Sequence, residues 1–244
     1  MPTPTRFPNG VTTAKKTETL GYYGEPDPTK WFTYFNDFRT ALDTNAGIWT
    51  TTKVGTGTWT VPDGANGVSL ITNTAADDDS IFNKLGSSFC SLAAGKKAIF
   101  KTRLTVSDIT QADWIIGLHI SDTTPFVTGG GGDSVTDGIY FGKEDGSTSI
   151  DFYVQKNTTT GQKISLGVAT QEAAGTYYTL GFVWDGVRYV DVFKNDVKVS
   201  SVDLGSSPTD FLPDALLTIG FGLVNGEAVA KTMSVDYLFF ATER

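Results

Sequence analysis

The sequence predicts an all-β protein, with two packed antiparallel sheets behind an extended N-terminal arm. The chain of 244 residues contains 27 Gly, 16 Phe, 9 Tyr and 5 Trp, a composition that favours pleated strands joined by tight turns. Short apolar stretches alternate with turn residues at the spacing of a sandwich, and no stretch keeps a helical period beyond a turn or two. The length fits one large domain, because all-β sandwiches of about 200–250 residues are common.

Residues 1–35 are expected to form the extended arm. They include five prolines, each of which removes a backbone donor and holds the preceding residue in an extended or turn conformation. The segment is also rich in aromatic residues, whereas disordered tails are poor in them. We therefore expect the arm to pack, either on its own domain or on a neighbouring subunit. Its interface candidates are Arg6, Phe7, Tyr22, Tyr23, Trp31 and Tyr34, because Arg and aromatic side chains dominate interface energetics.

Residues 36–244 are expected to form the sandwich. Residues 47–60 resemble a hairpin that turns at Gly55-Thr56-Gly57. In residues 97–106 an apolar and a polar face alternate with period 2, so one face of this strand is expected to be wet. Residues 114–120 are almost continuously apolar, which is typical of a strand covered on both sides. Further strands are expected at 67–72, 80–85, 138–141 and 149–155, the last two flanking a turn at Glu144-Asp145-Gly146.

The C-terminal part predicts a meander. Residues 177–184 meet 187–194 across Asp185-Gly186, a pair that tolerates the positive φ of a tight hairpin turn. Asn195-Asp196 then turns the chain into residues 197–204. Two further strands, at 216–224 and 232–240, complete the sandwich.

Charge and composition exclude several function classes. The chain carries 19 Lys and Arg against 27 Asp and Glu, a formal net charge of −8, so nucleic acid is not an expected partner. No apolar run approaches the ~18 residues of a membrane span, and the first residues lack the features of a signal peptide. The single cysteine, Cys90, and the single histidine, His119, exclude an intrachain disulfide framework and cysteine-rich zinc modules. Cys90 is expected to be a small core residue.

Several segments resemble known families. YYTLGFVWDGVRYVDVFKNDVKVSSVDL, followed by LLTIGFGLVNG and SVDYLFF, resembles the second half of a concanavalin-like (legume-lectin/glucanase) jelly roll, and the likeness extends over about residues 36–244 in strand order. PTRFPNGVTTA, EPDPTKWFTYFNDF and VDYLFFATER together resemble virion proteins of tailed bacteriophages. In those proteins an extended N-terminal segment precedes a jelly roll, and the protein decorates or cements the capsid.

The second resemblance implies a non-enzymatic capsid decoration or cement subunit on the capsid surface of the virion. Its partners would be the major capsid protein and further copies of itself, in a trimer; neither a cofactor nor a membrane is implied. The alternative is a carbohydrate-binding receptor module on the virion or tail, with a host glycan as partner. Candidate sugar-stacking residues for that alternative are Trp114, Tyr140, Tyr153 and Trp184, although each residue type is also common in a strand core.

No catalytic residues are predicted. Retaining glycosidases need two carboxylates about 5–5.5 Å apart, and concanavalin-like ones place them along one concave strand as Glu-x-Asp-x-x-Glu, which is absent here. His119 lies in an apolar strand with no local Ser or Cys and acid to complete a triad. The acidic stretches 77–79 and 133–137 lack the ligand spacing of an EF-hand, so no metal residue is predicted, and whether an acidic loop holds calcium stays open.

Overall fold

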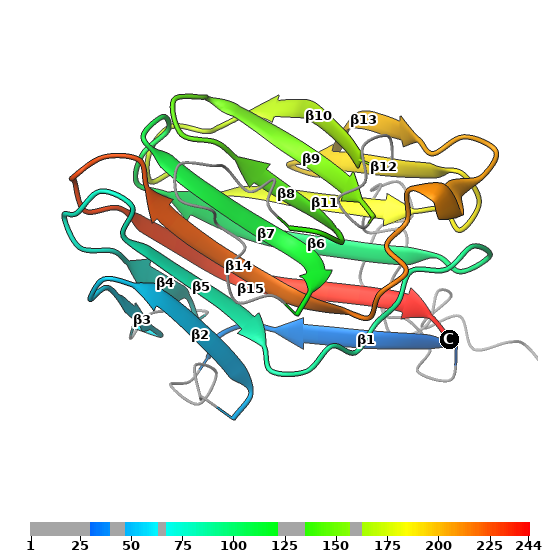
Figure 1. Cartoon of the computed structure of the whole chain (residues 1–244), viewed down its shortest axis with the longest axis horizontal. Helices are drawn as coiled ribbons and strands as arrows, with labels where there is room; N and C mark the ends of the chain where they lie inside the picture. The colour runs from blue at the N-terminus through cyan, green and yellow to red at the C-terminus, as the bar shows by residue number, and fades with distance from the viewer. Residues whose placement is uncertain (1–29, 40–46, 63–66, 122–134, 157–162) are drawn as a thin grey trace, which may run out of the picture.

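The fold is all-β, as the sequence predicts. A computed structural model describes residues 30–39, 47–62, 67–121, 135–156 and 163–244, and in these ranges it contains fifteen strands and one short 3₁₀ segment, Pro208–Asp210. The strands form two antiparallel sheets that pack face to face (Figure 1). No helix in the described ranges is long and apolar enough to cross a membrane.

One sheet has seven strands in the order β10-β9-β8-β7-β14-β5-β2. Neighbouring strands in this order pair antiparallel throughout. The strand bounds are β2 Trp49–Val54, β5 Ser80–Leu85, β7 Ala112–Ile120, β8 Gly138–Lys143, β9 Ser149–Gln155, β10 Lys163–Thr170 and β14 Leu217–Asn225.

The other sheet has eight strands, with the path β13-β12-β11-β6-β15-β4-β3 and β1 added beside β15. β15 is long enough to pair with two strands on the same side, β4 along its first half and β1 along its second. The bounds are β1 Trp31–Asn36, β3 Thr58–Thr60, β4 Ser69–Thr72, β6 Ala98–Val106, β11 Tyr178–Trp184, β12 Tyr189–Lys194, β13 Val197–Asp203 and β15 Thr232–Glu243.

The main core lies between the two sheets. On the central strand β7, Trp114, Ile116 and Leu118 are fully buried members of this core, whereas Ile115 belongs to a second apolar cluster. Because side chains alternate between the faces of a strand, Asp113 and His119 share the face of Ile115. Both faces of β7 are therefore covered, as the continuous apolar run predicts.

The predicted C-terminal meander is present. β11 and β12 pair across Asp185-Gly186, where Gly186 has a φ of +84°. β12 and β13 are joined at Asn195 and Asp196, with φ values of 50° and 62°. These left-handed conformations match the twist of a tight two-residue hairpin, which explains the choice of Asn and Asp at this turn.

The expected hairpin over residues 47–60 is wrong. β2 belongs to the seven-stranded sheet and β3 to the eight-stranded one, so the glycines between them carry the chain across the sandwich. Gly55 has a φ of +82°, and a Cβ there would lie within covalent distance of the Asp79 carboxylate. Two apolar strands around a glycine turn do not distinguish a hairpin from a crossover, because both need the same turn chemistry.

The boundary drawn between arm and sandwich, at residues 35 and 36, falls inside β1. Trp31 pairs with Glu243 and Asn36 with Leu238, and the Arg244 amide donates to the Lys30 carbonyl at 2.8 Å. Of the predicted interface residues, Trp31 and Tyr34 thus lie in the sheet. Trp31 packs against the apolar cluster of Ile99, Val183 and Phe193, and Tyr34 packs against the main core. Arg6, Phe7, Tyr22 and Tyr23 lie outside the described residues.

Cys90 is a core residue, as predicted. It is 4 % exposed, its Sγ donates to the Leu217 carbonyl at 3.6 Å, and burial raises the pKa of its thiol to about 12. A thiol held this far from the thiolate form is a poor nucleophile. Cys90 therefore has a packing role.

Candidate functional site

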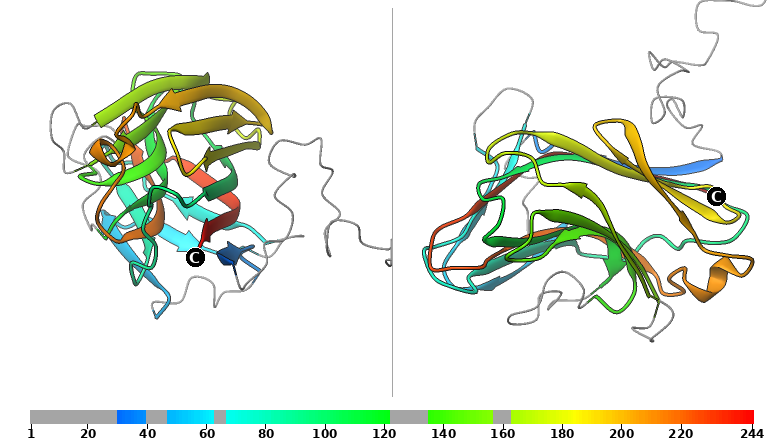
Figure 2. Two further views of the ribbon diagram at one scale, coloured as in Figure 1. Left: turned by 90° about the vertical axis from the view of Figure 1, so that its right-hand side faces the viewer. Right: turned by 90° about the horizontal axis from the view of Figure 1, so that it is seen from above.

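Both sheets curve in the same direction, and the hollow side of this curve is the outer face of the seven-stranded sheet (Figure 2). We call it the concave face. Its centre is filled by aromatic rings. Tyr140 and Tyr153 stack at 5.0 Å with an interplanar angle of 16°, and Phe82 lies 5.1 Å from the His119 ring. Glycines make room for them, since a Cβ at Gly220 would lie 2.1 Å from His119 Nε2. This concave face is an apolar cluster in its own right.

The four candidate sugar-stacking residues do not offer an exposed ring. Trp114 and Trp184 are in the main core, where their indole N–H groups donate to Gln171 Oε1 at 3.2 Å and to the Ala93 carbonyl at 3.1 Å. Tyr140 and Tyr153 do lie on the concave face, but they are 0 % and 1 % exposed. A sugar could not stack on any of these rings in this conformation.

The concave face also lacks a catalytic carboxylate pair in the described strands. Alternation places Asp113 of β7 and Asp151 of β9 on this face, with the whole of β8 between them. No described strand of this sheet presents two acids at positions i and i+2. His119 is buried among Phe82 and its neighbours, and its Nδ1 lies 2.6 Å from the Ile120 carbonyl.

An acidic pocket of about 360 Å³ lies at one end of the sandwich, where the ends of β7, β8 and β14 meet the β4–β5 connection. Its central carboxylate, Asp113, accepts a hydrogen bond from the Asp145 amide. Burial, together with the charges of Asp145 and Glu144, raises the pKa of Asp113 to about 6. The residues that line this pocket are Asp77, Asp78, Asp113, Glu144, Asp145, Asn225 and Gly226.

A buried cation lies beside this pocket. The Lys143 ammonium is fully buried and donates to three carbonyl oxygens, those of Thr110 at 2.9 Å, Ala112 at 2.6 Å and Glu144 at 3.0 Å. Burial lowers the pKa of Lys143, and the nearby charges of Asp113 and Asp145 act in the opposite direction. Within the described ranges, no three His, Cys, Asp or Glu side chains are arranged to hold a metal ion.

Asp113→Asn is expected to stabilise the protein at pH 8 and to have little effect at pH 4. The pKa of Asp113 is raised in the folded state, from 3.8 to about 6, so folding disfavours its charged form at high pH and this cost disappears as the carboxylate protonates. After allowance for solvent screening, we expect a gain of about 1–2 kcal/mol at pH 8.

Urea unfolding of both proteins between pH 4 and pH 8 measures this difference. The gain should develop across pH 4–6, and Glu144→Gln should give a smaller gain of the same sign, because Glu144 contributes to the raised pKa. A difference that is independent of pH would contradict the prediction.

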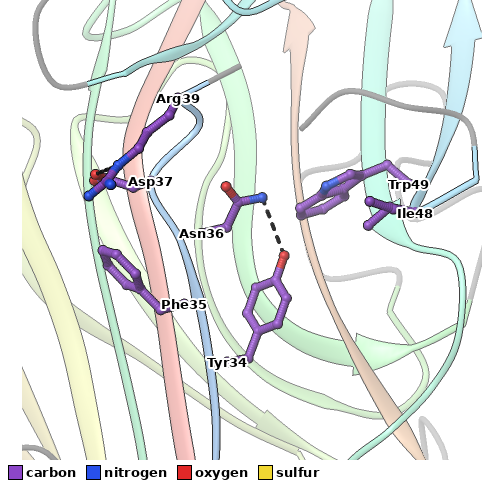
Figure 3. Close-up of a pocket in the computed structure, with 7 residues that line it drawn as sticks. All are labelled: Tyr34, Phe35, Asn36, Asp37, Arg39, Ile48 and Trp49. Atoms are coloured by element: carbon purple, nitrogen blue, oxygen red, sulfur yellow. Dashed lines mark hydrogen bonds and ion pairs between the residues drawn. The ribbon is translucent and has the colours of Figure 1, made fainter. Parts of the chain in front are cut away.

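A second pocket, of about 490 Å³, lies where β1 ends and β2 begins. We call it the β1 pocket. Figure 3 shows Tyr34, Asn36 and Trp49 converging on one side of β1, and Phe35, Asp37 and Arg39 on the other. Its volume lies in the usual range for small-molecule sites, about 300–1,000 Å³. It is lined, among the described residues, by Tyr34, Phe35, Asn36, Asp37, Arg39, Ile48 and Trp49.

A strained turn positions these residues. Phe38 has a φ of 44°, a left-handed conformation that is costly for a bulky side chain. The Asn36 side chain accepts a hydrogen bond from the Phe38 amide at 2.8 Å, and the Phe38 ring is buried against Trp49 and Phe221. The turn thus fixes Phe38 in the core and leaves Asp37 and Arg39 at the pocket, joined by an ion pair of 2.9 Å.

The indole of Trp49 is the chemically unusual group of the β1 pocket. It is 1 % exposed and packs edge-on against Trp59 and Phe221, yet its Nε1 has no hydrogen-bond partner. A buried N–H without an acceptor costs about 1–3 kcal/mol. The sequence analysis missed this pocket, since nothing in the sequence places residues 34–39 beside Ile48 and Trp49.

The chain matches no protein-family model and no curated protein sequence. Solved structures do match. The endo-1,3-β-glucanase from Streptomyces sioyaensis aligns with a TM-score of 0.61 at 13% identity, over 90% of this chain and 99% of the glucanase. The Emp47p carbohydrate recognition domain aligns with a TM-score of 0.58 at 12% identity, over 88% and 98%. A protein of unknown function from Shewanella oneidensis MR-1 aligns with a TM-score of 0.58 at 15% identity, over 88% and 87%.

These likenesses are below 25% identity and show the fold alone. Together with the two antiparallel sheets they establish a concanavalin-like jelly roll, which confirms the predicted fold class. The similar structures include both glucanases and carbohydrate recognition domains. The fold therefore leaves catalysis and binding to be decided by the residues of the site.

Proposed function

We propose that the protein is a non-enzymatic decoration subunit of a tailed-bacteriophage particle, attached to the shell through its N-terminal segment. The observation that carries the proposal is the pairing of β1 with β15. Residues 25–38 and 235–244 carry much of the resemblance to phage virion proteins, and they are about 200 residues apart in the sequence. Their strands lie side by side, so two separate parts of the resemblance belong to one structural unit.

The position of this unit supports an anchoring role. Among the described strands, β1 pairs only with β15, so its other edge has no strand partner. The chain before Trp31 therefore enters the sandwich at a sheet edge. An extended segment that enters at an edge can continue onto a neighbouring subunit and add main-chain hydrogen bonds there.

The rest of the sandwich supports a non-enzymatic role. The concave face is filled by buried rings and lacks an acid pair on any one described strand. The acidic pocket has a carboxylate with a raised pKa, but no aromatic residue lines it among those described. A jelly roll of this kind would act through its surface, with the major capsid protein and further copies of itself as partners.

Deleting residues 1–29 is expected to abolish attachment to particles stripped of the native protein. This truncation keeps β1 and the Lys30 carbonyl that accepts from Arg244, so the sandwich should retain its β-type circular dichroism and its cooperative melting. Co-sedimentation of the full chain and the truncated chain with stripped particles measures the difference. If the truncated chain coats the particles to full occupancy, the arm is not the anchor.

The second candidate function is a carbohydrate-binding receptor module. Carbohydrate recognition domains are among the similar structures, and the β1 pocket of this chain is lined by both aromatic and polar side chains. Binding of a host glycan would be compatible with a place on the particle surface. Microcalorimetry with β-glucans, galactans and host exopolysaccharide tests this function, and no heat of binding with any of them would contradict it.

A further inference from the structure

We infer that two copies of the chain pair through the free edges of their β1 strands, around a two-fold axis at Thr33. The inference goes beyond the proposed function, because it concerns the isolated protein and applies whether or not the protein belongs to a phage particle. β1 lies at the margin of the eight-stranded sheet, where β15 is its one partner among the described strands (Figure 1).

The first argument is that the free edge of β1 is unprotected. An edge strand exposes unpaired N–H and C=O groups, and bulges, charges or a short length usually keep such an edge from pairing with another chain. The pairings of β10 with β9 and of β13 with β12 contain register shifts, and β3 has three residues. β2 is regular but carries Lys53. β1 pairs with β15 over six residues without a register shift, and none of the six is charged.

The second argument is the direction of the main-chain groups. The Arg244 amide donates to the Lys30 carbonyl, so Lys30 and every second residue after it bond to β15. The N–H and C=O groups of Trp31, Thr33 and Phe35 therefore point to the free edge. A two-fold axis at Thr33 places this residue opposite its own copy and Trp31 opposite Phe35 of the other chain. All three residues then meet as hydrogen-bonded pairs.

The third argument is the match of the side chains. Tyr34 packs against the main core, so Trp31 and Phe35 lie on the outer face of the sheet. Trp31 packs there against the cluster that contains Ile99, and Phe35 is 57 % exposed. The two-fold pairing joins Trp31 of each copy to Phe35 of the other, and aromatic cross-strand pairs stabilise a sheet. On the inner face, Phe32 lies opposite Tyr34 of the other copy.

Charge also favours this antiparallel arrangement. Lys30 and Arg244 are exposed at the beginning of β1, and Asp37 follows its end. The two-fold axis brings the cationic end of each strand next to Asp37 of the other copy. The ion pair with Arg39 uses one carboxylate oxygen of Asp37, so the second oxygen can accept from the other copy. Arg244 Nε donates to the Trp31 carbonyl at 3.3 Å, and an amide of the other copy would replace this donor.

The size of the contact predicts a weak dimer. A buried aromatic side chain contributes about 150–250 Å², so the partly exposed rings of Trp31 and Phe35 from both copies add roughly a few hundred Å². With the two strand edges, the contact is near the lower limit of specific interfaces, about 1,200 Å². We therefore expect dissociation in the micromolar range. A two-fold contact closes after two copies, which gives a dimer where the resemblance to virion proteins implies a trimer.

Sedimentation equilibrium of the purified full chain, between about 5 and 300 µM, tests the inference. We expect the mass to rise from one copy towards two. Thr33→Pro should weaken the dimer at least about tenfold, because it removes a donor at the axis. The Thr33 N–H is not used in the ladder with β15, and proline is tolerated at such edge positions. Phe35→Ser, a change of an exposed side chain, should weaken the dimer in the same direction without affecting folding.

Thr51→Pro is the matched control. Thr51 lies in β2, the regular edge strand of the other sheet. The Gly86 amide donates to the Ile48 carbonyl, so alternation turns the Thr51 N–H away from β5. We expect Thr51→Pro to dimerise as the unaltered chain does. Circular dichroism of all three variants shows whether each keeps the β fold.

Cross-linking through a disulfide tests the register. In Thr33→Cys the two cysteines would lie opposite each other with their Cα atoms about 5.5 Å apart, a separation that suits a disulfide. The native Cys90 is buried and does not compete. Val54→Cys places a thiol at a site that is 59 % exposed on β2 and measures random cross-linking. We expect mild oxidation to give a covalent dimer of Thr33→Cys and not of Val54→Cys.

Three results would overturn the inference. They are a chain that stays monomeric at about 300 µM, an oligomer of any size that Thr33→Pro and Phe35→Ser do not weaken, and equal cross-linking of the two cysteine variants. None of them bears on attachment to stripped particles, which co-sedimentation measures separately. Failure of this inference is therefore distinguishable from failure of the proposed function.

Discussion

Lys143→Met is expected to lower the free energy of unfolding by about 3 kcal/mol. The ammonium is fully buried and supplies hydrogen bonds to three carbonyl oxygens, and a hydrogen bond to a charged group contributes about 1.5–3 kcal/mol. Methionine fills a similar volume but donates nothing. The variant would also leave Asp113 without its nearest positive charge, which adds to the loss.

Lys84→Met is the matched control for this change. Lys84 is also a buried lysine, 5 % exposed, but one contact is described for its ammonium, a donation to Ser121 Oγ at 2.8 Å. We expect a loss of about 1 kcal/mol from it. Urea unfolding at pH 7 measures both variants. Equal losses would contradict the role given to the three carbonyls.

Gly67→Ala is expected to cost more than about 3 kcal/mol and to disturb the β1 pocket. Gly67 has a φ of +67°, and a Cβ there would lie 2.1 Å from the Asp37 carbonyl oxygen and 2.5 Å from that of Phe38. Both are backbone atoms, so the turn that holds Phe38 at a φ of 44° would have to move. Forced backbone shifts and the left-handed conformation add up to a cost of this size.

Gly146→Ala separates the two parts of that cost. Gly146 has a similar φ of +74°, but a Cβ there would meet nothing within 4 Å. We therefore expect only the conformational cost, about 1 kcal/mol. Thermal unfolding of both variants measures the difference, and a Gly67→Ala protein as stable as Gly146→Ala would show that the turn at residues 36–39 is not fixed by this contact.

The strands that sequence predicts well are those with regular alternation and local turn chemistry. The β11–β13 meander follows from Asp185-Gly186 and Asn195-Asp196, whose conformations are local properties of the chain. β10 was not predicted, because its register shifts between Gly167 and Ala169 and the alternation is broken. β1 was assigned to the arm because prolines precede it at positions 26 and 28, and because its pairing with residues 238–243 is a distant contact that no local pattern shows.

The sites depend even more on distant contacts. The acidic pocket combines residues from four separate stretches of chain, and no local pattern in the sequence shows that these stretches meet. The environment of Lys143 depends on carbonyls that point inward at a strand end, and the sequence does not encode that direction locally. The exposure of Tyr140 and Tyr153 was undecided for the same reason, since alternation gives the face of a residue but not what covers it.

The measurement that tests the proposed function most directly is a cryo-EM map of the phage particle whose genome encodes this chain. We predict density for the two-sheet sandwich on the outer surface of the capsid, in repeated copies, with the β1–β15 edge nearest the shell. Particles that contain no copy of the chain, in the map and in mass spectrometry of their proteins, would contradict the proposal.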